Sequence, residues 1–284
     1  MALIPKLTLY ISKNPAVRNN FKLKNNTPVF KLDRDVVVFS NKIDITHILP
    51  RNIARTSGKT EQVTATLLPK TAFLNKKITI QDTGQVMKAP YEVNIARHDD
   101  SYMTTFHFLD KNTKQEIGYV SIIDWRKAPD IVRNYNVNIS RLQDDFPELG
   151  ITGDRISIDF LQNNFEDAFS GVGKLADRLA IEYCLKNGLK PNITSVAEYN
   201  SHAAHYLRGR RFLEVSKYDP DIDAYEFKKE YGTLDPNKII EERIKNTPKG
   251  QRVDTSDLGG LYMYMPQNVI NKYLAEIKAN PLLS

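Results

Sequence analysis

The sequence predicts an α+β fold in which a mixed, mostly antiparallel central sheet is flanked by helices. Residues 102–109 and 116–125 both alternate like strands and are joined by a polar turn, which indicates an antiparallel hairpin. Further along, an alternating segment at 156–161 is followed by a helical pattern from residue 172 and by a second strand-like segment at 193–199. The hairpin and the strand–helix–strand order together favour this fold class.

Residues 1–85 predict an extension of unknown role ahead of the main domain, residues 86–284. The stretch before Asp33 carries six Lys or Arg side chains and no acidic one. Such acid-poor openings occur in organelle transit peptides, but this one is rich in Asn and contains Pro, so a flexible leader or a surface strand is preferred. Residues 36–39 and 63–68 have β character.

The main domain is expected to begin with strands. Residues 91–95 predict a strand ahead of the hairpin, and 138–146 predict a helix between the hairpin and the strand at 156–161. In that last strand three apolar side chains share one face: Ile156, Ile158 and Phe160.

An amphipathic helix is expected between residues 172 and 187. Its apolar residues recur at three- and four-residue steps and form a buried stripe: Val172, Leu175, Ala176, Leu179, Ala180, Tyr183 and Cys184. Four charged residues are expected largely off that stripe: Lys174, Asp177, Arg178 and Lys186. Gly188 is placed for a left-handed C-terminal cap. Cys184, the only cysteine, is interpreted as a core thiol rather than a nucleophile.

The turn into this helix contains Gly171 and Gly173. The first-turn amides of a helix lack internal partners and point outward together, so a strand that enters a helix through small residues makes an anion site. Neither glycine has a Cβ that would keep a phosphate away from the backbone. The alternative is an ordinary loop before an amphipathic helix, and the motif alone does not decide between the two.

Strand and short-helix patterns alternate after this helix. Residues 193–199 predict a strand, Asn200 and Ser201 supply a cap for a short helix, and 212–216 are extended again.

The C-terminal part predicts an inserted helix near 235–247, for which Pro236 is preorganised at the first turn. A final strand at 261–265 and a helix at 267–278 follow.

From residue 155 to residue 212 the order of strand, glycine-rich turn, helix, strand, Asn-capped short helix and strand resembles the coenzyme-binding half of the GNAT superfamily of N-acetyltransferases. The phosphate signature of that family is Arg or Gln, two further residues, Gly, one residue, then Gly or Ala. Gly171 and Gly173 match it, and Ala168 stands at the basic or amide position.

The short helix and the strand after it carry the second part of the resemblance. Three residues fit the family's spacing: Asn200, Ala203 and Phe212. Leu207 and Arg211 stand where the family usually has Tyr and Gly, and Tyr206 comes one residue early. On a helix, a shift of one residue rotates a side chain by about 100°.

The resemblance implies a GNAT-like acyl-CoA N-acyltransferase fold with acetyl-CoA as the acyl donor. It implies that the pantetheine arm pairs with the backbone of three strand residues: Phe160, Leu161 and Gln162. It also implies that the pyrophosphate meets the amides of the glycine turn: Ser170, Gly171, Val172, Gly173 and Lys174. The Lys174 ammonium either adds a charge-assisted contact or lies in solvent. Asn200 either bonds to the pantetheine arm or serves as an N-cap.

The implied activity is that of a transferase, specifically an acyltransferase, in which an amine attacks the thioester of acetyl-CoA directly within a ternary complex. Such a reaction needs a base for the amine and an acid for the departing thiolate. Asp159 and Glu198 are candidate bases because each lies near the cleft end of a predicted strand, and Tyr206 is the candidate acid. His202 and His205 could relay protons, and without a third ligand no metal is expected.

Composition limits the class of partner. The formal net charge of +6 suits a polyanionic coenzyme and nucleic acid equally. No run of about 18 apolar residues exists, so no membrane span is expected. A single cysteine is compatible with a cytoplasmic location. The acceptor is taken to be a small-molecule or a protein amine, and the oligomeric state is left open.

Two other functional classes stay open. A catalytically degenerate acyl-CoA-binding module is favoured by Ala168, by the shifted Tyr206 and by two acidic residues next to the turn, Glu166 and Asp167. Nucleic-acid binding is the less favoured alternative, and it depends on basic and aromatic residues in one segment: Tyr206, Arg208, Arg210, Arg211 and Phe212.

Overall fold

The structure is a computed structural model of the chain. It describes residues 42–44, 64–80, 84–128, 156–166, 168–191, 193–198, 200–215 and 222–283. The chain divides into two compact units, Met1–Thr64 and Ala65–Ser284. In the first unit the described element is strand β1 (Lys42–Asp44). The strand expected at 36–39 and the helix expected at 138–146 lie outside the described residues.

The described residues of the second unit, with Thr64 at its boundary, form nine strands. They are β2 (Thr64–Thr79), β3 (Val86–Asp99), β4 (Met103–Asp110), β5 (Glu116–Asp124), β6 (Ile156–Asn163), β7 (Phe169–Ser170), β8 (Ile193–Ala197), β9 (Arg211–Phe212) and β10 (Leu261–Tyr264). Across the sheet the order is β2-β3-β4-β5-β6-β8-β10-β9, with β7 beside β2. Only β6 and β8 are parallel among these described neighbours. The expected mixed, mostly antiparallel sheet is confirmed.

Five helices accompany these strands in the described part of the second unit. They are α3 (Val172–Lys186), α4 (His202–Leu207), α5 (Ala224–Tyr231), α6 (Pro236–Asn246) and α7 (Gln267–Ala279). The expected helices α3, α4, α6 and α7 are confirmed, whereas α5 was not expected from the sequence. Gly188 follows α3 with a φ of 65°, as its expected role in the left-handed cap requires. Pro236 occupies the first turn of α6, where the Asp235 side chain accepts from the Asn237 amide.

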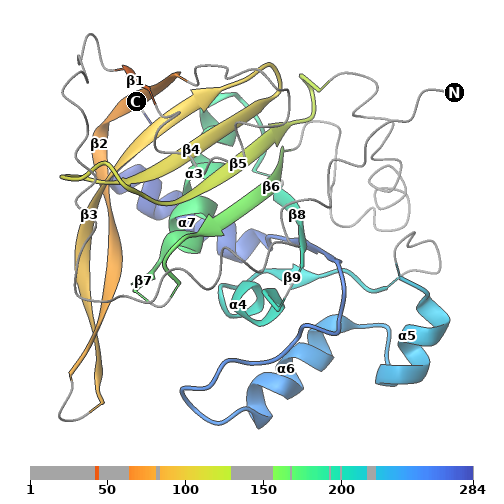
Figure 1. Ribbon diagram of the computed structural model, residues 1–284. Helices are drawn as coiled ribbons and strands as arrows, with labels where there is room; N and C mark the ends of the chain where they lie inside the picture. The colour runs from red at the N-terminus through yellow and green to blue at the C-terminus, as the bar shows by residue number, and fades with distance from the viewer. Residues whose placement is uncertain are drawn as a thin grey trace, which may run out of the picture. The chain divides into compact units, whose positions relative to one another are not determined.

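The hairpin of β2 and β3 extends beyond the other strands (Figure 1). Its two strands pair from Thr66↔Arg97 to Thr79↔Val86, but β3 pairs with β4 only from Val93 onward. Residues 65–80, expected within the N-terminal extension, therefore form part of the second unit.

The larger hydrophobic core lies between the sheet and the two helices α3 and α7, which lie side by side (Figure 1). Leu175, Leu179 and Tyr183 of α3 are buried there, as the stripe predicts. The expectation that Asp177 lies off this stripe is wrong, because its side chain is 1% exposed. A carboxylate buried to that degree requires a charged or hydrogen-bonded partner.

A second hydrophobic cluster joins α4, α5 and α6 to the last strands of the sheet. It includes Phe212, Phe227, Ile240, Leu261 and Met263. The segment between α4 and β10 thus has a core of its own beside the edge of the sheet.

Candidate functional site

Strands β6 and β8 separate soon after they meet. Their parallel register consists of two pairs, Ile156↔Ile193 and Ser157↔Thr194. Up to Ile158 the side chains of β6 are buried, but Phe160 is 37% exposed. On its other edge β6 remains paired with β5 as far as Asn163. Among the residues that the structure describes, the edge of β6 that faces β8 therefore has no strand partner after Ser157.

Asp159 lies at a β-bulge in this part of β6. Ser121 pairs with Phe160 and Ile122 with Ile158, so Asp159 is the extra residue. A bulge bends its strand and changes the direction of a side chain, and bulges are frequent beside active sites. Asp159 is exposed, yet the packing around its carboxyl group raises the pKa by desolvation. A carboxyl with a raised pKa is a better base near neutral pH than an ordinary one.

Tyr119 of β5 holds the side chains that follow the bulge. Its ring stacks on Phe160 with centroids 6.0 Å apart, and its hydroxyl donates to Gln162 Oε1 at 3.1 Å. Gln162 donates in turn to Asn164 Oδ1 at 2.8 Å. Burial raises the pKa of Tyr119 above its usual range, so the phenol stays protonated and donates. Tyr119 was not among the residues expected at the site.

The turn from β6 to α3 is fixed by long-range backbone contacts. Residues Phe169 and Ser170 form β7, which pairs with Lys76 and Asn75 of β2. Next to this ladder, the Lys77 amide donates to Ala168 O at 2.8 Å. These bonds hold the turn against the edge of β2, so its shape does not depend on local sequence alone.

The N-terminus of α3 carries no side-chain cap. Its N-cap residue is Gly171, whose φ of 99° is a left-handed conformation that glycine adopts readily. No acidic residue lies in the first turn of the helix. The first backbone bond of the helix runs from the Leu175 amide to Gly171 O, so the amides ahead of Leu175 lie before the first internal bond. The helix N-terminus is thus uncapped, as an anion site requires, and anion binding there stays a prediction.

A largely buried group of ionisable residues lies against this helix end. It is called the α3 cluster here and consists of Asp177, His205, Arg208 and Arg210. Arg210 Nη2 donates to Asp177 Oδ1 at 2.6 Å, and Arg208 Nε donates to Asp177 Oδ2 at 3.4 Å. Arg208 Nη2 lies 2.6 Å from His205 Nδ1, and Arg210 Nη1 donates to Ser195 Oγ of β8 at 2.7 Å. The cluster therefore ties α3 to β8 and to α4.

Gly173 allows the Arg208 guanidinium to approach the first turn of α3. A Cβ atom at this position would lie 2.7 Å from Arg208 Cζ, which is too close for an ordinary contact. A larger residue at position 173 would therefore displace the Arg208 guanidinium from its present place. One signal in the sequence could have revealed this arrangement, because Asp177 lies four residues after Gly173 and hence on the same face of the helix.

The side chain of Lys174 pairs with a neighbouring helix. Its ammonium forms a 2.7 Å ion pair with Glu276 of α7, and both side chains are exposed. The Ser170 hydroxyl donates to Asn75 O at 3.4 Å. The structure thus brings Ser170, Gly171, Val172, Gly173 and Lys174 together at one helix end, with the side chains of Ser170 and Lys174 directed to neighbouring elements.

The candidate acid Tyr206 packs toward α6. Its hydroxyl donates to Glu241 Oε2 at 3.3 Å, and the Arg211 guanidinium lies 4.4 Å from the centre of its ring. Burial raises the pKa of Tyr206, so the phenol is protonated at neutral pH. In the described part of the chain no hydrogen bond joins Tyr206 to Asp159.

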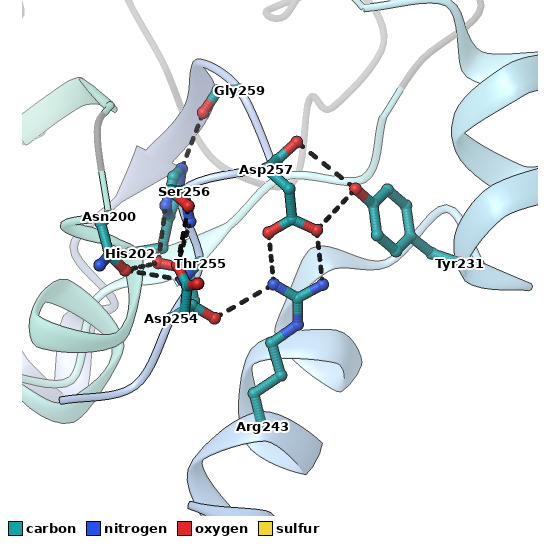
Figure 2. Close-up of polar contacts among 9 residues, drawn as sticks. All are labelled: Asn200, His202, Tyr231, Arg243, Asp254, Thr255, Ser256, Asp257 and Gly259. Atoms are coloured by element: carbon teal, nitrogen blue, oxygen red, sulfur yellow. Dashed lines mark hydrogen bonds and ion pairs between the residues drawn. The ribbon is translucent and has the colours of Figure 1, made fainter. Parts of the chain in front are cut away.

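Asn200 holds the loop that precedes β10. Its φ is 58°, and its Oδ1 accepts from the Thr255 amide at 2.6 Å and from the Thr255 hydroxyl at 3.0 Å (Figure 2). The N-cap of α4 is Ser201, without a side-chain cap bond. His202 contacts the same loop, with Nε2 2.9 Å from Gly259 O. Glu198, the second candidate base, is exposed at the end of β8, and its carbonyl accepts from the Ser201 hydroxyl.

In the described ranges no group of three or more His, Cys, Asp or Glu side chains is arranged to hold a metal ion. None of the helices described here combines the length and the apolar character needed to cross a membrane. No protein-family model matches this chain, and no curated protein matches it.

Proposed function

We propose that the chain is an N-acetyltransferase that moves an acetyl group from acetyl-CoA to an amine, and that it works in the cytoplasm as a GNAT-like enzyme. The observation that carries the proposal is the early separation of β6 from β8 beside an uncapped helix N-terminus. An extended chain with amide groups can pair with the open edge of β6, and a diphosphate can accept from the amides of the first turn. Acetyl-CoA has both parts in one molecule.

The coenzyme then lies along two segments of the chain. Its pantetheine arm pairs with the backbone of Phe160, Leu161 and Gln162, beyond the last β6–β8 pair. Its pyrophosphate accepts from the amides at the start of α3, where Gly171 is the N-cap residue and the Arg208 guanidinium lies beside Gly173. This assignment agrees with the GNAT-like order of strand, turn, helix and strand.

The reaction is an aminolysis of the thioester. The neutral amine attacks the carbonyl carbon, a C–N bond forms, and the C–S bond breaks as the tetrahedral centre collapses. A base removes a proton from the amine nitrogen, and the thiolate of coenzyme A takes up a proton. Asp159 is the preferred base because it lies at the bulge beside the open edge and its pKa is raised.

Binding and turnover test the proposal in that order. Isothermal titration with acetyl-CoA should show saturable binding, and hydrogen exchange should slow at residues 160–162 and 171–174 when it is added. A thiol-release assay over a panel of amines then identifies the acceptor class. Absence of binding at millimolar acetyl-CoA, or protection confined to other segments, would contradict the proposal.

The candidate base has its own test once an acceptor is found. Asp159→Asn should lower kcat by about 10²- to 10⁴-fold while acetyl-CoA affinity is retained. Asp100→Asn, in the exposed turn between β3 and β4, is the matched control. Equal activity of the two variants would remove Asp159 from the mechanism.

A catalytically degenerate acyl-CoA-binding module is the second candidate. It is favoured by the position of Tyr206, whose hydroxyl is engaged by Glu241 while its ring lies against Arg211. Acetyl-CoA binding without thiol release for any amine would select this alternative. Nucleic-acid binding has less support, because Arg210 is 1% exposed and Arg208 is bonded within the α3 cluster.

A further inference from the structure

The α3 cluster has more positive than negative charge. Arg208 and Arg210 are cationic, and Asp177 is the carboxylate in contact with both. Burial, together with the neighbouring Arg208 and Arg210, holds the pKa of His205 far below its usual range, so the imidazole is neutral. The cluster as described therefore carries two cations and one anion. A net charge in a buried position is unfavourable unless something balances it.

The position of the cluster increases this imbalance. The Arg208 guanidinium lies against Gly173, in the first turn of α3. The N-terminal end of a helix has a partial positive charge, so it attracts anions and repels cations. Within the described part of the chain, Asp177 is the carboxylate paired with both arginines, and it must also offset the helix end. An anion bound between Arg208 and the first-turn amides would complete the balance.

Arg208 also has hydrogen-bonding capacity to spare. Its Nε and Nη2 are directed at Asp177 and His205, and no acceptor for Nη1 is found among the described residues. Its side chain is 22% exposed, so it is the less buried of the two arginines. In the same cluster Arg210 Nε is buried without a hydrogen-bond partner among the described groups. Two arginines that share one carboxylate thus leave donors unused.

We propose that Arg208 is the cationic ligand of the coenzyme's pyrophosphate, in place of the basic residue that is Ala168 in the turn. The inference rests on the proposed acetyl-CoA site and deepens it. Asp177 and His205 orient the guanidinium through its Nε and Nη2 atoms. Its Nη1 atom and the amides of the first turn of α3 then bind the phosphate oxygens. The cation that a GNAT-like turn would carry is supplied here from the end of α4. The ligand chemistry is a diphosphate group.

The experiment compares ligands with and without that diphosphate. Dissociation constants of acetyl-CoA, S-acetylpantetheine and inorganic pyrophosphate are measured for the wild type, Arg208→Gln and Arg208→Lys. Arg211→Gln is the control variant, because Arg211 is close in sequence and lies over the Tyr206 ring. Arg208→Gln should raise the dissociation constants of acetyl-CoA and pyrophosphate by about 10- to 100-fold and leave that of S-acetylpantetheine unchanged. Arg208→Lys should recover part of the loss, and Arg211→Gln should change little.

The outcomes separate the inference from the function on which it rests. If the wild type binds acetyl-CoA and Arg208→Gln binds it equally well, the role of Arg208 is overturned and the proposed function stands. If Lys77→Gln weakens the binding of acetyl-CoA while Arg208→Gln does not, the cation that binds the pyrophosphate is Lys77 of β2, and the inference is wrong. If pyrophosphate binds in an Arg208-dependent way but acetyl-CoA does not bind, the anion site stands and the acetyltransferase proposal fails. Binding of neither ligand overturns both.

A measurement on the wild type keeps the inference testable if Arg208→Gln does not fold. The Nε–H resonance of Arg208 in a proton–nitrogen correlation spectrum, assigned with Arg208→Lys, should shift when pyrophosphate is added. An unchanged Arg208 resonance at saturating pyrophosphate would overturn the assignment.

Discussion

Two arginine–aspartate groups in this chain have similar chemistry and different charge balance. In the α3 cluster one buried carboxylate serves two guanidinium groups. The second group, called the loop tether here, consists of Tyr231, Arg243 and Asp257 (Figure 2). There one carboxylate meets one guanidinium through two bonds, of 2.5 and 2.8 Å, and the Tyr231 hydroxyl donates to it at 3.0 Å.

The comparison separates a structural role from a binding role. The loop tether pairs one guanidinium with one carboxylate, so it is neutral, and Arg243 Nη1 also donates to Asp254 O. It joins α5 and α6 to the loop before β10 and needs nothing more. The α3 cluster is positive, has unused donors and lies at a helix N-terminus. Incomplete pairing at a buried position calls for an explanation, and the proposed diphosphate would supply one.

The largest expected effect comes from removing the shared carboxylate. Asp177→Asn leaves two guanidinium groups buried without a counter-charge and should lower the free energy of unfolding by about 3–5 kcal/mol. The same change in the loop tether, Asp257→Asn, should cost about 1 kcal/mol or less, because that pair is partly exposed. Urea denaturation of both variants measures the difference. Equal costs would mean that burial and charge balance do not distinguish the two groups.

Acidification should destabilise the α3 cluster through His205. Its folded-state pKa is lowered, mainly by burial and then by Arg208 and Arg210, with a small effect of His202. Below the unfolded-state pKa of about 6.5 the unfolded chain therefore binds the extra proton and the folded chain does not. The free energy of unfolding should therefore fall by about 2 kcal/mol between pH 7 and pH 5.

His205→Gln tests the source of that loss. Urea denaturation of this variant should show a smaller decrease over the same pH interval than the wild type. His202 is the second histidine with a lowered pKa, and His202→Gln measures how much of the stability loss on acidification comes from that residue. If both variants keep the full pH dependence of the wild type, the titrating group lies elsewhere.

A methyl group at position 173 should disturb the α3 cluster without disturbing the helix. Gly173→Ala places a Cβ against the Arg208 guanidinium, which must move away from the helix end. We expect about tenfold weaker binding of acetyl-CoA, while alanine favours the helix itself by about 1 kcal/mol. S-Acetylpantetheine is the ligand control, since it lacks phosphates and should bind as before. A variant with unchanged acetyl-CoA affinity would show that the close approach has no part in binding.

The smallest effect is expected in the loop tether. Hydrogen bonds from Arg243, stronger than the opposing desolvation, lower the pKa of Asp257 to about 2. The stabilisation is complete above the unfolded-state pKa of about 3.9 and is lost as the pH falls toward the folded-state value. Arg243→Ala should cost about 1 kcal/mol or less at neutral pH and show a shallower stability change between pH 4 and pH 2. Thermal denaturation over that interval measures it.

The elements that sequence patterns predict are those with a strong local signal. β6 alternates cleanly, and α3 has a continuous apolar stripe with a glycine at its end. α5 was missed because it is only 8 residues long and Phe227 is its one buried residue, so few apolar positions mark it. β7 was missed because two residues make no pattern, and its partner strand lies 95 residues away along the chain.

The site shows the same division between local and distant signals. The glycine turn ahead of α3 was visible as a motif, and its position at a helix N-terminus is confirmed. The surroundings of Arg208 depend on packing between α3, β8 and α4, which no short motif encodes. Asn200 matched a motif locally, whereas its side-chain oxygen bonds to Thr255 at a distance of 55 residues. The N-cap interpretation of Asn200 is wrong, because Ser201 is the N-cap of α4, and the contact with Thr255 is one that no local pattern contains.

The ladder between β7 and β2 has a consequence for the order of folding. Strand β6 and helix α3 are near neighbours in sequence and can associate early, but closing the long segment between Asn75 and Ser170 costs chain entropy. We therefore expect the turn ahead of α3 to reach its final shape only after the β2–β3 hairpin has docked. A shortened polypeptide that begins after this hairpin would retain the glycine motif and lack the strand against which that motif is set.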